Sequence, residues 1–307
     1  RWDNYGIWIY NIGGKMGADY LIFTDVSTDI DKEMLKKYDI RFVPMEYVLG
    51  TDTFYCEQPE TEEMMHNYYE KLRNKIETHT SQITPNNYYE VFEPFVKEGK
   101  SLIYISLSSG LSNTYESALL AANNLKEDYE DAEIEIVDSL SATGGMGILC
   151  EIAGMNREKG MNCKENAEWL RNNAIRINHW FEVEDLIYLK RGGRVSAATA
   201  VIGTALNIKP VLRIDREGHL ENIDKKRGNK LALKALFDRF TESFDMHIEY
   251  PVYISCADNM KDAMALKEMI LEKYPEAAVR VTMLSPIIGA HTGPDIVALI
   301  HYGKERE

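Results

Sequence analysis

Short apolar runs alternate with helical patterns along the first half of the chain, and this alternation decides the fold class. Strands are predicted at residues 20–24, 40–43, 102–105 and 133–137. Polar residues follow three of them, at Asp25–Ser27, Ser106–Thr114 and Asp138–Ser139. Strands that alternate with helices build a parallel sheet, and ligands bind at the edge where the carboxyl ends of its strands lie. The sequence therefore predicts an α/β protein in which these polar segments converge.

Two helices in this half have informative patterns. Residues 61–75 place Met65, Tyr69 and Leu72 at helical spacing behind an N-cap at Thr61. Residues 144–155 are rich in Gly and Ala. Small side chains let a helix approach its neighbours, so this second helix is expected to pack closely on the sheet.

The second half has its own pattern. Helices are predicted at 183–189, 197–206, 231–244 and 261–273, strands at 209–214, 251–256 and 278–284, and a short apolar helix after Pro294. A chain of 307 residues is long enough for two domains. We place the boundary after the turn at Gly160, which predicts domains at 16–172 and 173–307. Residues 1–15 are left out, because Met16 stands just before the first predicted strand.

Charge and composition exclude several classes of partner. The formal charge is -14, from 49 acidic and 35 basic side chains, and such a field opposes binding to nucleic acid or to an anionic membrane. The opening residues lack the basic and apolar segments of a signal peptide, and no apolar run reaches about 20 residues, so membrane insertion is not expected. The 4 cysteines stand far apart without CxxC spacing, which favours reduced thiols and a cytoplasmic location.

The densest polar segment is Ser106–Thr114, with five hydroxyls, Gly110 and Asn113 between a buried strand and a helix start. Hydroxyls and free backbone N–H groups at such a place suit an anion. The same residues also form an ordinary serine-rich turn with an N-cap. Both interpretations stay open at this point.

His291 stands between Gly289 and Gly293 after a predicted strand. Flanking glycines favour a loop that approaches a ligand closely, so a binding role is predicted for this histidine. Thr80 and Ser81 precede another helix, where alone they indicate only an N-terminal turn.

Other chemistry finds less support. A Ser/His hydrolase using Ser112 and His291 is an alternative, but the segment 110–114 has Thr where the nucleophile elbow G-x-S-x-G needs its second Gly. No metal-ligand spacing and no glycine-rich nucleotide motif occurs, so no metal and no cofactor is expected. Lys225, Lys226 and Arg227, with Lys230 and Lys234, form the one dense basic cluster; it is either a solvated helix face or a docking site for an acidic partner.

Taken in order, the motifs resemble those of the DegV family over about residues 19–300. The motifs, which follow one another in the family's order, are Phe23–Asp29, Phe42–Pro44, Thr80–Gln82, Ser108–Thr114, Val137–Ser139, Leu189–Arg194, Leu206–Pro210 and Gly289–Pro294. Each motif is weak singly, whereas the ordered set is specific.

The resemblance implies two domains: an N-terminal Rossmann-like domain with a parallel sheet, and a C-terminal α/β sandwich domain that holds an acyl chain. It implies a non-catalytic carrier of one long-chain fatty acid such as palmitate, stearate or oleate, bound with its carboxylate at the domain interface. Related proteins hand the acid to the catalytic subunit of a fatty acid kinase. By resemblance to the family motifs at these positions, the expected head-group ligands are Thr80, Ser112 and His291. Ser81 and Ser109 are expected to lie next to them.

Two positions depart from the family pattern. Asn113 stands where the family usually has Gly, so the turn differs or gains an amide donor. Asp295 replaces a second Gly near His291, and its carboxylate is expected to orient the imidazole, raise its pKa or repel the bound acid.

Magnitudes indicate which part of such a ligand gives affinity. At about 0.8 kcal/mol per methylene, a sixteen-carbon tail contributes on the order of 11 kcal/mol gross. A helix N-terminus and a few hydroxyls contribute only about 0.3–3 kcal/mol at the head. The hydroxyls are therefore expected to set orientation, and the length of the cavity to select the acid.

Overall fold

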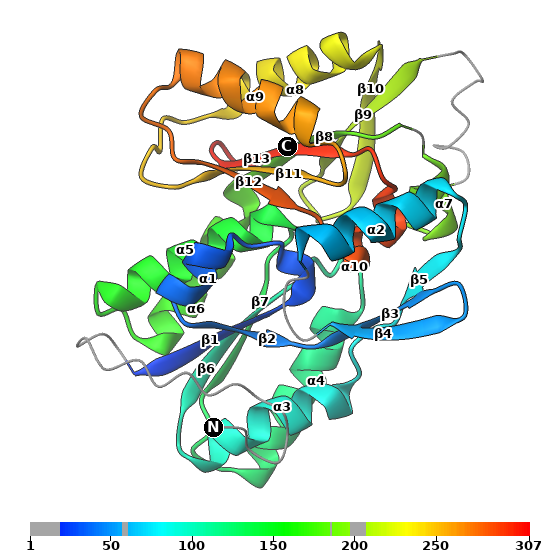
Figure 1. Ribbon diagram of the computed structural model, residues 1–307. Helices are drawn as coiled ribbons and strands as arrows, with labels where there is room; N and C mark the ends of the chain where they lie inside the picture. Colours follow the sequence, from blue (N-terminus) through cyan, green and yellow to red (C-terminus); the bar gives the residue numbers. More distant parts are fainter. Residues whose placement is uncertain (1–18, 57–60, 185, 197–206) are drawn as a thin grey trace.

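The computed structural model describes residues 19–56, 61–184, 186–196 and 207–307. Its first sheet has the order β2-β1-β6-β7 and all its strands are parallel. The strands are β1 (Tyr20–Asp25), β2 (Ile40–Val43), β6 (Ser101–Ser106) and β7 (Ile134–Asp138). The accompanying helices are η1 (Val26–Thr28), α1 (Lys32–Lys37), α3 (Pro85–Lys97), α4 (Thr114–Asp128) and α6 (Cys163–Asn173). These four strands and their parallel arrangement confirm the prediction (Figure 1).

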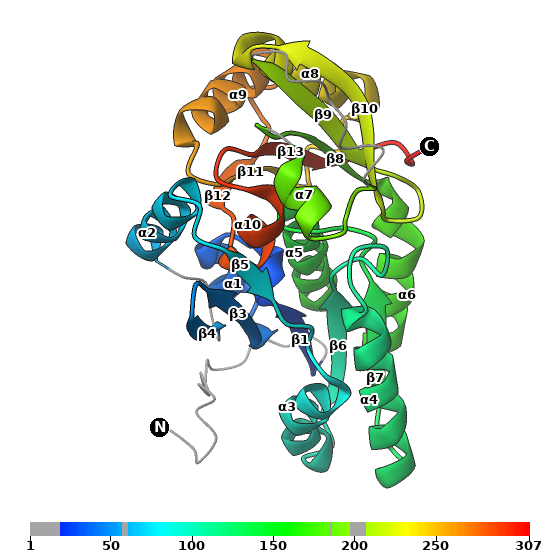
Figure 2. The ribbon, with the colours of Figure 1, turned by 90° about the vertical axis from the view of Figure 1, so that its right-hand side faces the viewer.

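A small antiparallel sheet, β4-β3-β5, lies beside the parallel one (Figure 2). Its strands are β3 (Met45–Leu49), β4 (Asp52–Cys56) and β5 (Thr78–Thr80). The helix α2 (Glu62–Arg73) precedes β5, and the Thr61 hydroxyl accepts a hydrogen bond from Met64 N as predicted. The sequence reasoning missed this sheet, whose last residue is Thr80.

The second half forms one six-stranded sheet in the order β10-β9-β8-β13-β11-β12. Its strands are β8 (Ile177–Glu182), β9 (Ile208–Ile214), β10 (Leu220–Arg227), β11 (Val252–Cys256), β12 (Val279–Met283) and β13 (Val297–Tyr302). The helices α8 (Asn229–Ser243) and α9 (Met260–Lys273) cover one of its faces (Figure 1). The short elements η2 (Ala174–Arg176), α7 (Ile187–Arg191) and α10 (Pro286–Thr292) lie along its connections.

The helix α5 (Gly144–Glu158) packs between the two large sheets, against β1 and β6 on one side and β8, β11 and β13 on the other. Twelve of its 15 residues are buried. A Cβ at Gly144 would lie 2.7 Å from Tyr253 Cβ, and one at Gly145 would overlap the His179 ring. The glycines therefore permit the close packing that the sequence predicted, and α5 is the shared wall of both halves.

The largest correction concerns the end of the chain. The apolar segment after Pro294 was predicted as a helix, but it is β13, an inner strand paired antiparallel with β8 and β11. Every residue of β13 is buried. A strand buried on both faces loses the two-residue alternation, so its apolar run cannot be distinguished from a helix by periodicity.

Other expectations need smaller corrections. The helix predicted at 183–189 begins only at Ile187, and residues 177–182 before it form β8. The basic segment 225–227 lies on strand β10 and not on a helix. His291 lies in the helix α10 and not in a loop. The helix predicted at 197–206 and residues 1–15 lie outside the described residues, and the domain limits 16–172 and 173–307 stay a prediction.

All 4 cysteines lie among the described residues, are buried and form no disulfide; they are Cys56, Cys150, Cys163 and Cys256. Burial raises the pKa of the Cys150 and Cys256 thiols to about 12. Among the helices that the structure describes, none has both the length and the apolar composition that crossing a bilayer requires.

A buried tyrosine joins α2 to the second half. The Tyr69 hydroxyl donates to the Leu284 carbonyl at 2.8 Å, and the side chain is fully buried. We expect Tyr69→Phe to lower the free energy of unfolding by about 1–3 kcal/mol, because the carbonyl is left buried without its donor. Tyr89→Phe is the matched control, since its hydroxyl bonds Asp128 at the surface; chemical denaturation of both variants measures the difference. Equal losses would contradict this account.

Candidate functional site

A cavity of about 480 Å³ lies where the two halves meet. Its walls come from β5, the turn after β6, the start of α5, α7, α10 and the six-stranded sheet. Pockets for small ligands usually occupy about 300–1,000 Å³. All six predicted site residues line it: Thr80, Ser81, Ser109, Ser112, Asn113 and His291.

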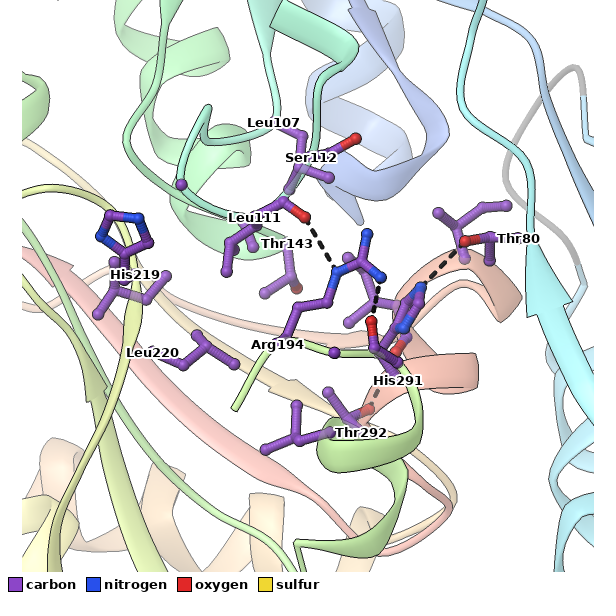
Figure 3. A pocket seen from close by; sticks show the side chains of 18 of the residues that line it. Thr80, Leu107, Leu111, Ser112, Thr143, Arg194, His219, Leu220, His291 and Thr292 are labelled. Carbon is purple, nitrogen blue, oxygen red and sulfur yellow. Dashed lines mark hydrogen bonds between the residues drawn. The ribbon is translucent and has the colours of Figure 1, made fainter. Parts of the chain in front are cut away.

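Thr80 and His291 meet across the cavity wall. The Thr80 hydroxyl and His291 Nε2 form a hydrogen bond of 3.0 Å between residues 211 positions apart (Figure 3). Thr80 ends β5, and His291 lies near the end of α10, which packs against β5 and α7. The structure thus brings together two of the three predicted head-group ligands.

His291 is held as a neutral imidazole. Burial and, to a smaller extent, the positive charge of Arg194 together lower its pKa to about 4. Its Nδ1 is buried without a hydrogen-bond partner among the described groups, and it faces Gly192 so closely that a Cβ there would overlap it. The imidazole therefore offers Nε2 alone to the site.

The Asp295 carboxylate has a partner other than His291. Its Oδ1 accepts from Arg73 Nη2 at 2.9 Å, and Arg73 lies on α2. Of the three effects expected from Asp295, two are wrong: the carboxylate does not orient His291, and the pKa of His291 is lowered and not raised. The ion pair with Arg73 instead ties α2 to the segment that follows α10.

Ser112 lies in the turn between β6 and α4, on the opposite side of the cavity. Its hydroxyl forms a hydrogen bond of 2.6 Å with Thr114 Oγ1 and accepts one from Thr114 N at 3.3 Å. It forms no described hydrogen bond with His291, so the nucleophile and base of the hydrolase alternative are not paired. Asn113 has φ -75°, an ordinary conformation that does not need Gly, and its carbonyl accepts from Gln82 Nε2.

The remaining predicted residues lie at the rim. The Ser81 hydroxyl donates to Glu46 Oε1 at 3.0 Å and is thereby turned toward β3. Ser109 is exposed, and its backbone N–H donates to Asp138 Oδ1 at 3.2 Å. Their hydrogen bonds shape the loops, whereas Thr80, His291 and Ser112 face the cavity.

Arg194 is a site residue that the sequence reasoning missed. Its Nε donates to the Leu111 carbonyl at 3.0 Å, and its guanidinium also bonds the Gly192 carbonyl (Figure 3). The side chain is half-buried, and burial lowers its pKa from the usual arginine value. The motif 191–194 carries the signal, since two arginines flank two glycines directly after a helix.

The rest of the cavity is mainly apolar. Aliphatic and aromatic side chains come chiefly from the six-stranded sheet, α7 and α10, and they are Leu107, Leu111, Phe181, Leu189, Ile214, Leu220, Ile287, Ile288, Ile296 and Ala298. His179 also lines the cavity, but burial lowers its pKa to about 3 and its Nε2 lies 3.2 Å from the Ala142 carbonyl. His179 therefore adds no charge to this wall.

One cluster with metal-ligating groups lies elsewhere in the described part of the chain. His66, Glu70 and Asp258 bring ligand atoms within 4.8 Å of one another. The Arg73 guanidinium pairs with both carboxylates, at 3.0 Å to Glu70. The positive charge of Arg73 thus already neutralises the cluster. It is an exposed ion-pair network between α2 and the segment after β11.

Comparisons with known proteins agree with this architecture. A DegV domain-containing protein of Clostridium perfringens is 37% identical over 289 residues, which cover 94% of this chain and 99% of that protein. The structure described as fatty acid binding of a DegV family protein from Thermus thermophilus has a TM-score of 0.81 at 25% identity, and covers 93% of this chain and 100% of its own. The Streptococcus pneumoniae fatty acid kinase B3 protein loaded with linoleic acid also has a TM-score of 0.81, at 22% identity over 93% of this chain and 100% of its own.

The family comparison covers nearly all of the described residues. The model for the uncharacterised proteins of the DegV family matches residues 20–304. That span includes both large sheets and every residue that lines the cavity. The chain belongs to the DegV family.

Proposed function

We propose that the protein binds one long-chain fatty acid in the cavity between its halves, with the carboxylate among Thr80, Ser112, Arg194 and His291. The observation that carries the proposal is the division of the cavity into a polar part and an apolar part. Thr80, Arg194 and His291 gather on one side in Figure 3, and Leu220 lies on the other. An amphipathic ligand with one acidic end matches this division.

The polar part suits a carboxylate. A carboxylate only accepts hydrogen bonds, and hydroxyls, an imidazole N–H and a guanidinium are donors. Moving an unpaired carboxylate out of water is costly, and the half-buried Arg194 supplies the opposite charge. Since His291 is neutral at pH 7, the head group would be held by one cation and several neutral donors.

The apolar part suits an alkyl tail. About 0.8 kcal/mol per buried methylene makes the tail the main source of affinity. The relatives give independent support, because the Thermus thermophilus protein is described as fatty acid binding and the Streptococcus pneumoniae protein holds linoleic acid. We expect a carrier without chemistry or cofactor of its own, in keeping with a Ser112 that is not paired with His291.

Binding can be tested directly. Protein expressed in bacteria and then denatured should release a fatty acid detectable by mass spectrometry. Thr80→Val, Ser112→Ala and His291→Gln should each weaken oleate binding about 10- to 100-fold, because a hydrogen bond to a charged group contributes about 1.5–3 kcal/mol. Titration calorimetry on delipidated protein measures the change.

Ser101→Ala is the control, since that hydroxyl bonds Glu133 at the far end of β6. It should bind oleate as the parent does. The proposal fails if no lipid copurifies and delipidated protein binds neither palmitate nor oleate.

The apolar wall should set chain length. Ala298 lies on β13 and lines the cavity, so Ala298→Leu shortens the space for the tail. We expect affinity for stearate to fall about 10-fold more than affinity for laurate, because overfilling a packed site costs about 1–3 kcal/mol.

Ala263→Leu on α9 is matched to it, being buried outside the cavity. Ala263→Leu should lower the stability of the protein without altering the ratio of its affinities for stearate and laurate. An unchanged stearate-to-laurate ratio in Ala298→Leu would place the tail elsewhere.

We further propose that the bound acid is presented to a fatty acid kinase catalytic subunit in the cytoplasm. Four buried cysteines outside any disulfide fit a reducing compartment, and the Streptococcus pneumoniae neighbour is a fatty acid kinase B3 protein. The docking surface would include the basic strand segment Lys225, Lys226 and Arg227 on β10. Basic side chains in an acidic protein suit an acidic partner surface.

Charge reversal tests this surface. Lys225→Glu combined with Arg227→Glu should slow acyl phosphate formation by a bacterial fatty acid kinase catalytic subunit with ATP, while oleate affinity stays unchanged. Lys164→Glu on α6 is the control for added negative charge. Loss of both activities would indicate misfolding, and full activity of the double variant would rule out this docking surface.

A further inference from the structure

The helix that carries His291 is anchored at its N-cap residue by a carboxylate from the other end of the chain. The Ser285 backbone N–H donates to Asp29 Oδ1 at 2.6 Å, across 256 positions of sequence. Asp29 and Ser285 are 7% and 8% exposed. Ser285 is the N-cap residue of α10 and makes no side-chain cap, so this bond fixes the residue from which the helix starts without satisfying the helix's own first N–H groups.

Asp29 is itself rigidly placed. It follows η1 with φ 43° and ψ 35°, the left-handed region that non-glycine residues rarely occupy. Next to it, Thr143 at the start of α5 has φ 48°, and its N–H donates to the Ser27 carbonyl at 3.0 Å. Asp29 Oδ1 accepts from the Ser285 N–H, whereas Asp29 Oδ2 is buried without a hydrogen-bond partner among the described groups. Strained residues persist where the surrounding structure holds them, so Asp29 is a fixed point between β1, α5 and α10.

The other end of α10 is equally constrained. His291 lies six positions after Ser285, or about 9 Å along the helix at about 1.5 Å per residue. There the imidazole bonds Thr80 at 3.0 Å and lies against Gly192 with no room for a Cβ. A rigid helix held at both ends transmits a shift of its first residue to the imidazole.

We propose that Asp29 is a positioning residue, which sets His291 for the ligand's carboxylate by fixing the start of α10. The consequence for affinity rests on the proposed function, whereas the consequence for the imidazole does not. Asp29 touches α10 only at its start, so its effect must pass through the helix.

The hydrogen bond between Ser285 N–H and Asp29 Oδ1 decides which variants of Asp29 are informative. Burial raises the pKa of Asp29 to about 7, and the oxygen that accepts from Ser285 is present in either protonation state. Asp29→Asn keeps an acceptor there, and Asp29→Ala removes it. Both Asp29 and Ser285 border a second cavity of about 240 Å³, so truncation enlarges an existing space instead of opening one in packed core.

Asp31 offers a matched control. It borders the same second cavity and also caps a helix, since its Oδ1 accepts from Glu33 N and Met34 N of α1. Asp31→Ala therefore removes the N-cap of α1 without touching α10. A general loss of stability would affect both variants alike.

The first experiment needs no ligand. Nitrogen-15 NMR of the imidazoles in delipidated protein should show a shifted His291 Nε2 resonance in Asp29→Ala, and the parent resonance in Asp29→Asn and Asp31→Ala. An unmoved His291 resonance in Asp29→Ala, or an equal shift in Asp31→Ala, would overturn the proposal.

The second experiment measures oleate affinity in a double-mutant cycle. Asp29→Ala should weaken binding about tenfold, and Asp29→Asn less than about threefold. Combined with His291→Gln, Asp29→Ala should add nothing further, because it acts through that side chain. Additive losses would refute the positioning role, while a parent protein that binds no fatty acid would refute the proposed function and leave the NMR result to judge Asp29.

Discussion

The close contact of α5 with both large sheets is the constraint from which the site follows. Gly144 and Gly145 let the helix approach Tyr253 and His179 of the six-stranded sheet, while its other side packs on β1 and β6. With one helix as a common wall, the two sheets have a fixed relation. The turn after β6, the end of β5 and the helices α7 and α10 then meet over the start of α5, where the cavity lies.

Within that frame the polar groups of the site are placed at some energetic cost. His291 is kept neutral by burial and carries a buried Nδ1 without a partner among the described groups. Arg194 loses part of its hydration but donates to two backbone carbonyls. The polar part of the cavity therefore holds one cation and a neutral imidazole, although the protein as a whole is strongly acidic.

Much of the parallel half could be predicted from sequence, because three of its four strands end in polar residues and are followed by helices. The cavity-lining positions of Thr80, Ser112 and His291 were predicted through the family motifs, and composition alone would not have paired Thr80 with His291 across 211 residues. The strands β8 and β13 were missed, since strands buried on both faces show no alternation. Arg194 was missed because its role depends on carbonyls of Leu111 and Gly192 that only the fold brings near.

The burial of the cysteines has a practical consequence for reagents. A thiol reacts with maleimides and iodoacetamides as its thiolate, and at neutral pH the Cys150 and Cys256 thiols, with a pKa of about 12, are almost wholly protonated. Cys56 and Cys163 are shielded from solvent as well. A single cysteine introduced on an exposed strand or helix would therefore be the fast-reacting one, and a fluorophore could be attached there without first removing the native thiols.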